Sequence, residues 1–273
     1  MPPLQVLEFR PAASRPSDLE TETTGNMILM GNSALFAGLE PSQCRDIVLS
    51  SRPRVFARDE ILFMQGHPVR THVLIQSGNV KITQLSDAGR EVLLWINGPG
   101  ETVAIPAPSR RHGCSARAMT KCQALSWEDS RFQSLMEKYP RIGDNINRML
   151  FLQLVELEQR FREIATENVP TRLSLALLRL AGQLGQPILG GVEISLSRAE
   201  LAQMTGTTLF TVSRILSKWA EGGFIAPRRQ GVIIYDSEQL LRAGAERESL
   251  PARVPPLNSF SRASSLIREP LDA

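Results

Sequence analysis

The spacing of apolar residues changes once along this 273-residue chain, near residue 128, and the change limits the folds available to it. Before it, short apolar runs alternate with turn residues such as Ser77-Gly78-Asn79 and Asn97-Gly98-Pro99-Gly100. Short strands separated by glycine-centred turns predict an antiparallel sandwich or barrel. After it, apolar residues recur every three or four positions, which is the period of a helix. We therefore expect an α+β protein with a strand-rich first half.

The chain divides into five segments by composition and period. Residues 1–30 and 245–273 contain many prolines and serines without a sustained period, so we expect flexible tails. Between them we expect a strand-rich domain over 31–128, a helical region over 129–167 and a third domain over 168–244. Hydrophobic residues make up 42% of the chain, which is typical of a folded protein.

Several features indicate a cytoplasmic protein. No apolar run approaches the ~20 residues that cross a bilayer, and the first ten residues lack the pattern of a secretory signal. The three cysteines, Cys44, Cys114 and Cys122, are odd in number and widely spaced, which is typical of reduced thiols. We therefore expect no membrane association. The net charge of +3 permits a nucleic-acid partner without requiring one.

A long helix is predicted over residues 141–166, because that stretch has no proline and no glycine after Gly143. Its apolar residues repeat at alternating spacings of four and three, which is the contact seam of a coiled coil. We expect a parallel homodimer along this seam, with an interface formed by Leu150, Leu154, Leu157, Phe161 and Ile164 and extended upstream by Ile146 and Met149. The alternative is that the helix packs against its own strand-rich domain.

A short helix, a glycine-containing turn and a second helix are predicted between Ser197 and Trp219. Ser197 and Glu200 have the spacing of a capping box at the first helix. A helix-turn-helix of this kind places its second helix in the major groove of DNA. Arg214 is the best candidate to read a base, because a guanidinium pairs bidentately with guanine. The other predicted contacts are Ser197, Arg198, Thr207, Thr208, Leu209, Phe210, Thr211, Ser213 and Lys218.

Two short β-runs follow, around the basic segment Pro227-Arg228-Arg229-Gln230-Gly231. This pattern predicts a hairpin, or wing, next to the helix-turn-helix. Arg228 and Arg229 at its tip are expected to contact phosphates, which adds affinity that depends on salt but not on base sequence. A solvated turn is the alternative.

Residues 34–240 resemble the CRP/FNR family of bacterial transcription regulators. The resemblance is carried by residues 201–216 with the hairpin after them, by residues 73–82, 89–92 and 98–101, and by the order of these segments. It implies a jelly-roll-like β-roll sensor, a dimerisation helix and a winged helix-turn-helix. It also implies a homodimer on a palindromic operator, a small-molecule effector and RNA polymerase as a partner. Residues 207–214 look closest to the nitrogen-oxide-responsive branch, although Phe210 stands where the family often has Glu.

The resemblance also bears on the effector. Members that bind cyclic nucleotides carry a Gly-Glu pair and an Arg, and these positions fall here on Ala104, Ile105 and His112. In those members the Glu accepts a hydrogen bond from the ribose, and the guanidinium fork of the Arg binds the cyclic phosphate. Because this chain lacks both groups, we do not expect cyclic AMP to bind. Arg110, Arg111 or Arg117 could replace the fork only if the loop shifts. The candidate pocket residues are Gly100, Glu101, Ala104, Ile105, His112, Cys114 and Ser115.

The identity of any cofactor stays open. An oxygen-sensing iron–sulfur cluster needs about four thiolates, and three cysteines do not provide them. Haem remains an alternative, with His67, His72, His112 or a thiol as ligand, and so does thiol oxidation at Cys114 or Cys122. We predict no metal site and no enzyme, because the chain has no phosphate loop and no recognisable Ser/His/Asp arrangement. The alternative to a regulator is a ligand-binding or protein-interaction module whose helix-turn-helix is only structural.

Overall fold

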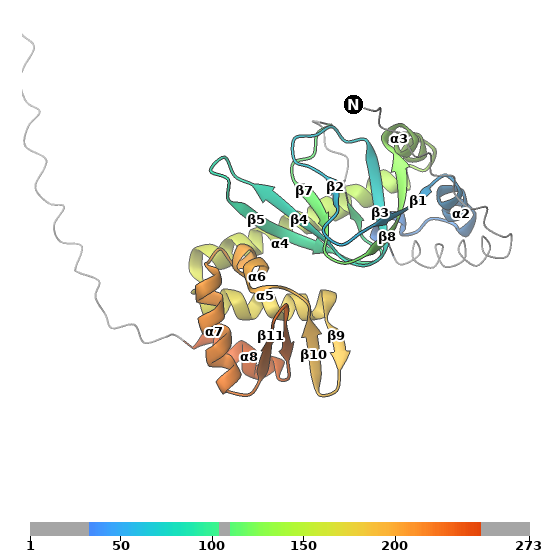
Figure 1. Ribbon diagram of the computed structural model, residues 1–273. Coiled ribbons are helices and arrows are strands. Elements are labelled where there is room, and N and C mark those ends of the chain that lie inside the picture. Colours follow the sequence, from blue (N-terminus) through green and yellow to red (C-terminus); the bar gives the residue numbers. More distant parts are fainter. Residues whose placement is uncertain (1–32, 104–109, 247–273) are drawn as a thin grey trace, which may run out of the picture.

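The computed structural model describes residues 33–103 and 110–246, which form two domains joined by a long helix (Figure 1). The tail expected over 1–30, the tail expected over 245–273 beyond Glu246, and the pocket candidates Ala104 and Ile105 lie outside the described residues.

The first domain is a β-roll of two antiparallel four-stranded sheets, which confirms the predicted fold class. One sheet has the order β1-β8-β3-β6, formed by β1 (Arg52–Phe56), β8 (Cys122–Glu128), β3 (Thr71–Ser77) and β6 (Thr102–Val103). The other has the order β2-β7-β4-β5, formed by β2 (Ile61–Phe63), β7 (Ser115–Ala118), β4 (Val80–Leu85) and β5 (Glu91–Asn97). The hairpin predicted at residues 87–90 joins β4 to β5, and Gly89 supplies the positive φ of its turn (φ 74°).

Strand β3 is apolar without alternation because both of its faces are buried. Val73 and Ile75 point between the two sheets, whereas Leu74 packs with Trp127 beneath a layer of helices. Successive strand residues point to opposite faces, so one strand can serve both apolar clusters. The helical layer consists of η1 (Ala34–Phe36), α2 (Pro41–Leu49), α3 (Asp129–Lys138) and the start of α4 (Arg141–Thr166).

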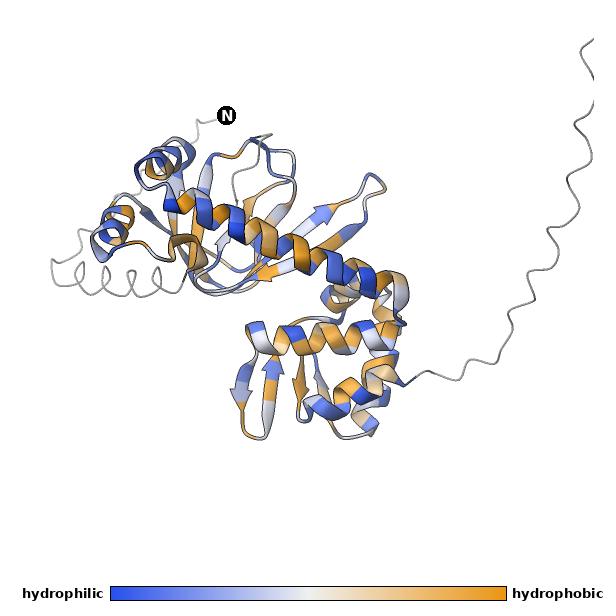
Figure 2. Cartoon of the chain, turned by 180° about the vertical axis from the view of Figure 1, so that it is seen from behind, coloured by the Kyte–Doolittle hydropathy of each residue, from blue (hydrophilic) through white to orange (hydrophobic). Residues whose placement is uncertain are grey.

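The helical region expected over 129–167 contains two helices rather than one. Helix α3 ends before Tyr139, and α4 begins at Arg141 with Pro140 as its N-cap residue. From there α4 runs over the whole stretch that the apolar seam predicts. It crosses the molecule in Figure 2 with no other element in front of it.

The second domain follows a short connection after α4. It contains α5 (Val169–Leu184), β9 (Gln186–Ile188), β10 (Gly191–Ile194), α6 (Arg198–Thr205), α7 (Leu209–Glu221), β11 (Ile225–Arg228), β12 (Gly231–Ile234) and α8 (Ser237–Ala245). The four strands form one sheet of order β11-β12-β10-β9. Leu173, Leu177, Val212 and Leu216 join its helices in a single apolar core. No helix in the described part of the chain is both long and apolar enough to span a membrane.

Candidate DNA interface and effector cavity

Both ends of α6 are fixed by local structure. At its start, the Ser197 hydroxyl accepts from the backbone N–H of Glu200 at 3.2 Å, and the Glu200 carboxylate accepts from the N–H of Ser197 at 3.0 Å. This confirms the predicted capping box at the start of α6. Gly206 ends the helix in the left-handed conformation (φ 63°), which favours glycine. The bounds of α6 therefore follow from its own sequence.

Helix α7 has one buried side and one exposed side. Val212, Ile215, Leu216 and Trp219 are buried in the domain core. The opposite side carries the exposed residues Leu209, Phe210, Arg214, Ser217 and Lys218. Phe210 is 79% exposed and Leu209 is 53% exposed, so neither of them serves the core of its own chain. This exposed side has the length and the chemistry to contact base edges and phosphates.

The first turn of α7 is capped by a threonine. Thr208 is the cap, because its hydroxyl accepts from the N–H of Thr211 at 3.1 Å. The two hydroxyl oxygens, Thr208 Oγ1 and Thr211 Oγ1, lie 2.9 Å apart in a further hydrogen bond. Thr207, just outside the helix, donates its backbone N–H to the Ala202 carbonyl.

The two candidates on α6 are held differently from those on α7. The Ser197 hydroxyl lies 2.7 Å from the Glu200 carboxylate within the capping box. Arg198 is half-buried, and its Nε has no hydrogen-bond partner in the described residues. Ser197 and Arg198 therefore lie at the start of α6, whereas Ser213 and Arg214 lie on α7.

Strands β11 and β12 form the predicted wing, paired from Ile225–Ile234 to Arg228–Gly231. Arg228 and Arg229 are exposed at its tip. Gln230 beside them accepts a hydrogen bond from Arg58 of the β-roll at 3.1 Å. The tip thus presents two guanidinium groups on the domain that carries α7.

Helix α4 presents apolar side chains to solvent along most of its length. Leu150, Leu154, Leu157, Phe161 and Ile164 are between 44% and 72% exposed, and Phe151, Leu152 and Val155 are exposed beside them. Ile146 and Met149, which the sequence pattern adds to the seam, pack instead into the core of their own β-roll. The alternative that α4 covers its own domain therefore describes only the first part of the helix.

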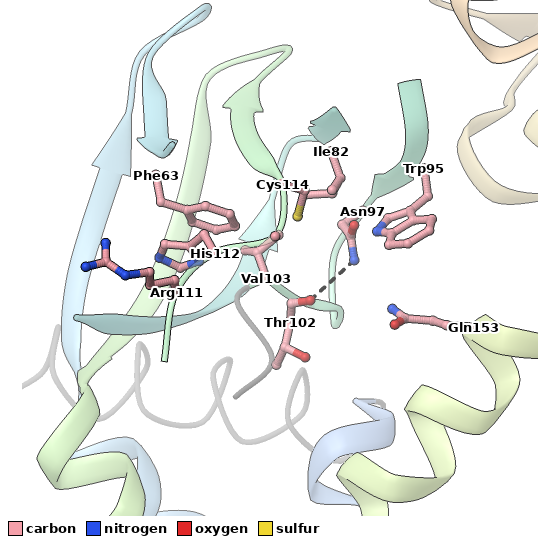
Figure 3. A pocket seen from close by; sticks show the side chains of 11 residues that line it. Phe63, Ile82, Trp95, Asn97, Thr102, Val103, Arg111, His112, Cys114 and Gln153 are labelled. Carbon is pink, nitrogen blue, oxygen red and sulfur yellow. Dashed lines mark hydrogen bonds between the residues drawn. The ribbon is translucent and has the colours of Figure 1, made fainter. Parts of the chain in front are cut away.

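A cavity of about 130 Å³ lies inside the β-roll, between its sheets and α4 (Figure 3). Of the pocket residues predicted from the sequence, His112 and Cys114 line it. The remaining lining residues are Phe63, Ile82, Trp95, Asn97, Thr102, Val103, Arg111, Gly113 and Gln153. Gly100, Glu101 and Ser115 are not among the described lining residues, and the side chains of Glu101 and Ser115 instead take part in local hydrogen bonds. Glu101 accepts from the Gly98 N–H at 2.7 Å, and Ser115 accepts from the Gln65 N–H at 3.0 Å.

Asn97 and Gln153 were not recognised from the sequence. Asn97 stands at the start of an Asn-Gly-Pro-Gly turn and has the appearance of turn punctuation. Gln153 lies among the apolar residues of α4, where a polar residue is expected to face solvent. Only the long-range packing of α4 on the β-roll brings them to one cavity.

The three arginines considered for a phosphate fork have other partners. Arg110 pairs with the Asp129 carboxylate, Arg111 donates to the Gly66 carbonyl at 2.7 Å, and Arg117 donates to the Asp59 carbonyl at 2.9 Å. In Figure 3 the Arg111 guanidinium points away from the cavity.

Three titratable groups of the β-roll are held in their neutral forms. Burial, with smaller effects of His72 and His67, lowers the pKa of His112 below its ordinary value of 6.5. The imidazole is therefore neutral at pH 7, and it stacks on Phe63 with ring centroids 3.8 Å apart. Burial raises the pKa of the Cys114 and Cys122 thiols, which keeps them protonated and slow to oxidise.

Two of the three histidines considered as haem ligands pack against other groups, whereas His67 is exposed. His72 is buried, stacks on Phe132 and hydrogen-bonds Asp129 at 2.9 Å, so its ring is held in the core. His112 is covered on one face by Phe63. Within residues 33–103 and 110–246 there is no group of three His, Cys, Asp or Glu side chains placed to hold a metal ion.

Comparison with known proteins agrees with both halves of the structure. A family model for a cyclic nucleotide-binding domain matches residues 53–139, and one for a Crp-like helix-turn-helix domain matches residues 171–243. The CRP-like cAMP-activated global transcriptional regulator of Mycobacterium tuberculosis is 30% identical to the chain over 219 residues. That alignment covers 78% of this chain and 97% of the mycobacterial protein.

Solved structures show the same fold at lower identity. The c-di-GMP responsive global regulator CLP of Xanthomonas campestris aligns with a TM-score of 0.64 at 24% identity, covering 72% of this chain and 100% of that one. FixK2 from Bradyrhizobium japonicum also aligns with a TM-score of 0.64, at 18% identity, covering 72% of this chain and 98% of that one. These similarities concern the arrangement of the elements and say nothing about the ligand.

Proposed function

The chain belongs to the CRP/FNR family of DNA-binding transcription regulators, and on that premise we propose that it reads a palindromic operator as a homodimer. Like its family, it is a regulator with an effector-binding domain and not an enzyme. The observation that carries the proposal is the exposed side of α7, where Arg214 and Lys218 project from a helix fixed by its Thr208 cap and its Trp219 anchor.

The apolar surface of α4 supports the homodimer. Its seam residues Leu154, Leu157 and Phe161 stay about half or more exposed in the single chain. Contiguous exposed apolar surface of this kind marks an interaction site, and the heptad spacing fits a second copy of the same helix. If a two-fold axis along α4 relates two copies of the chain, their two α7 helices can enter successive major grooves, about one helical turn of DNA apart.

The side chains of α7 fall into two proposed roles. Arg214, with Ser213 and Thr211 beside it, reads base edges, whereas Lys218 and the wing residues Arg228 and Arg229 contact phosphates. Phe210 is available to contact a thymine methyl group, since it is exposed and apolar. A half-site that differs from the family's usual one is the expected consequence.

Three further parts of the proposal follow from the resemblance. We propose a place near the nitrogen-oxide-responsive branch from residues 207–214, and RNA polymerase as a partner and a cytoplasmic location from the family. We propose that the effector is not cyclic AMP, because His112 is neutral and the nearby arginines are engaged with other groups.

Selection from a random duplex library tests the function. The purified full-length protein should enrich a palindrome whose half-sites are about one helical turn apart, and a mobility-shift assay should show binding at nanomolar protein at physiological salt. A scrambled duplex of the same composition is the control. Equal affinity for both duplexes, with and without a lysate extract as a source of effector, would favour the alternative in which the helix-turn-helix is only structural.

A further inference from the structure

Two residues in the wall of the β-roll cavity, Asn97 and Thr102, each have a buried side-chain oxygen, Oδ1 and Oγ1, that has no hydrogen-bond partner in the described residues. Both residues are only 7% exposed. The Asn97 carboxamide is held in place because its Nδ2 donates to the Thr102 carbonyl at 3.3 Å. Oδ1 is therefore the free acceptor, and Figure 3 shows it between Cys114 and Trp95. An unpaired buried acceptor costs free energy, which a ligand with a donor group would recover.

The rest of the cavity wall is apolar or neutral. The Phe63 ring, the Trp95 ring, Ile82 and Val103 supply most of it, and the neutral His112 imidazole completes it. Among the described lining residues no cation points inward, since the Arg111 guanidinium donates to Gly66 on the outer side (Figure 3). An anion would thus lose its hydration without gaining an opposite charge, which strongly disfavours its entry.

The volume of the cavity suits a small ligand. About 130 Å³ is close to the volume of engineered protein cavities that hold one benzene molecule. A nucleotide, with a base, a sugar and a phosphate, is much larger. The aromatic walls also match a ring, because aromatic pairs stack or meet edge to face.

We propose that the β-roll of this protein takes an uncharged compound with one aromatic ring and one O–H or N–H group, which donates a hydrogen bond to Asn97 Oδ1. The idea rests on the proposed function only in treating the β-roll as the effector domain. Gln153 of α4 lines the same cavity and points toward Asn97 in Figure 3. The ligand therefore lies against the helix that leads to the DNA-binding domain.

The test uses phenol and toluene, which have nearly the same shape but differ in the donor. The full-length protein contains three tryptophans, so labelling with ¹⁵N-tryptophan gives three indole N–H signals in an NMR spectrum. Trp95 lines the cavity, whereas Trp127 lies in the β-roll core and Trp219 in the second domain. Phenol should shift the Trp95 signal alone, and it should bind at least about fivefold more tightly than toluene. Cyclic AMP should not shift it.

The variant Asn97→Leu removes the acceptor, so phenol should lose its advantage over toluene. The Trp127 signal reports whether the variant keeps the β-roll fold. If the variant loses this fold, the relative affinity of phenol and toluene for the unmodified protein tests the proposal. Equal affinity for phenol and toluene in the unmodified protein, no shift with either probe, or saturable binding of cyclic AMP would overturn the proposal. Mobility shifts on the same preparation separate the two ideas: operator binding without phenol binding removes only the ligand class.

Discussion

Arg214 lies one turn after Phe210 on the exposed side of α7, in the position from which a guanidinium reaches base edges. Its replacement by alanine should lower affinity for the selected operator by roughly 10- to 100-fold, because a bidentate contact to guanine contributes about 1–3 kcal/mol. Binding to the scrambled duplex should change little. The measurement is a pair of mobility-shift titrations.

The control for this prediction is Arg242→Ala. Arg242 is exposed on α8 and pairs with Glu238 four residues earlier. The substitution removes the same charge as Arg214→Ala, but it lies outside α7. If Arg214→Ala and Arg242→Ala left operator binding equally intact, Arg214 would not be a base-reading residue.

Glu200 joins the capping box of α6 to the β-roll, because its carboxylate also accepts from Lys81 at 3.0 Å. Burial alone would raise the pKa of this carboxyl, but donation from the Ser197 N–H and hydroxyl and from Lys81 holds it below its ordinary value of 4.5. A carboxyl whose pKa is lowered by folding stabilises the fold above the pKa it has in the unfolded chain. That stabilisation disappears as the pH falls through the folded pKa.

The pH dependence of Glu200→Gln follows from this. At pH 7 the free energy of unfolding of the variant should be about 1 kcal/mol smaller than that of the unmodified protein. Glutamine keeps the cap but loses the charge pair with Lys81. The difference should shrink below pH 4.5 and vanish once Glu200 is protonated in the folded state. Urea unfolding curves at several pH values measure it. A difference that stays constant down to about pH 3 would contradict the assigned charge state.

Among the elements, α4 has the surface that is hardest to explain in a single chain. Replacing Leu154 and Leu157 with glutamate puts two charges per chain into the proposed seam, so the protein should become monomeric in sedimentation equilibrium. The matched control is Leu49→Glu with Leu85→Glu, which changes two exposed leucines outside α4. It should leave the mass unchanged. A monomer before any substitution would also contradict the proposed seam.

The wing is expected to act through charge alone. Replacing Arg228 and Arg229 with alanine should weaken binding to the operator and to the scrambled duplex by similar factors. The slope of log affinity against log salt should become shallower by about 0.9 for each phosphate that is no longer neutralised by an arginine. Weaker binding to the operator alone would assign the wing a base-reading role instead. Fluorescence anisotropy at several salt concentrations gives both the affinities and the slope.

The elements that follow from local sequence are the ones that could be predicted. The bounds of α4 and the capping box of α6 depend on residues within a few positions of each other, so period and spacing reveal them. Strand β9 was missed because Pro187 and the nearby Gly185, Gly190 and Gly191 look like loop residues, although β9 pairs along β10. Of the described lining residues of the cavity only His112 and Cys114 were predicted, because residues such as Asn97 on β5 and Gln153 on α4 meet through packing.

In the whole molecule, the β-roll docks on the second domain through β5 and α6. Leu93 and Ile96 of β5 belong to the same apolar cluster as Leu201 and Ala202 of α6. Gln203 donates to Glu91 at 3.3 Å at the edge of this contact. The contact links the strand that lines the effector cavity to the helix that supports α7, so a change at the cavity has a direct physical connection to the DNA interface.

Arg160 of α4 lies at the centre of this docking. Its guanidinium donates to the carbonyl oxygens of Leu93 and Leu94 on β5 and, at 3.5 Å, to that of Met204 on α6. One side chain thus connects the long helix, the β-roll and the second domain. Removing it leaves these carbonyls without their charged donor, which should weaken the docking by about 2 kcal/mol.

Hydrogen exchange followed by mass spectrometry measures this effect of Arg160→Ala. Amides of α6 and of the connection over residues 167–168 should exchange faster than in the unmodified protein, while amides of β3 keep their rate, because β3 lies in the core of the β-roll. Arg162→Ala is the matched control, since Arg162 is exposed two residues further along α4. Equal exchange in α6 for the two variants would mean that Leu93 and Ile96 dock the domains by apolar contact alone.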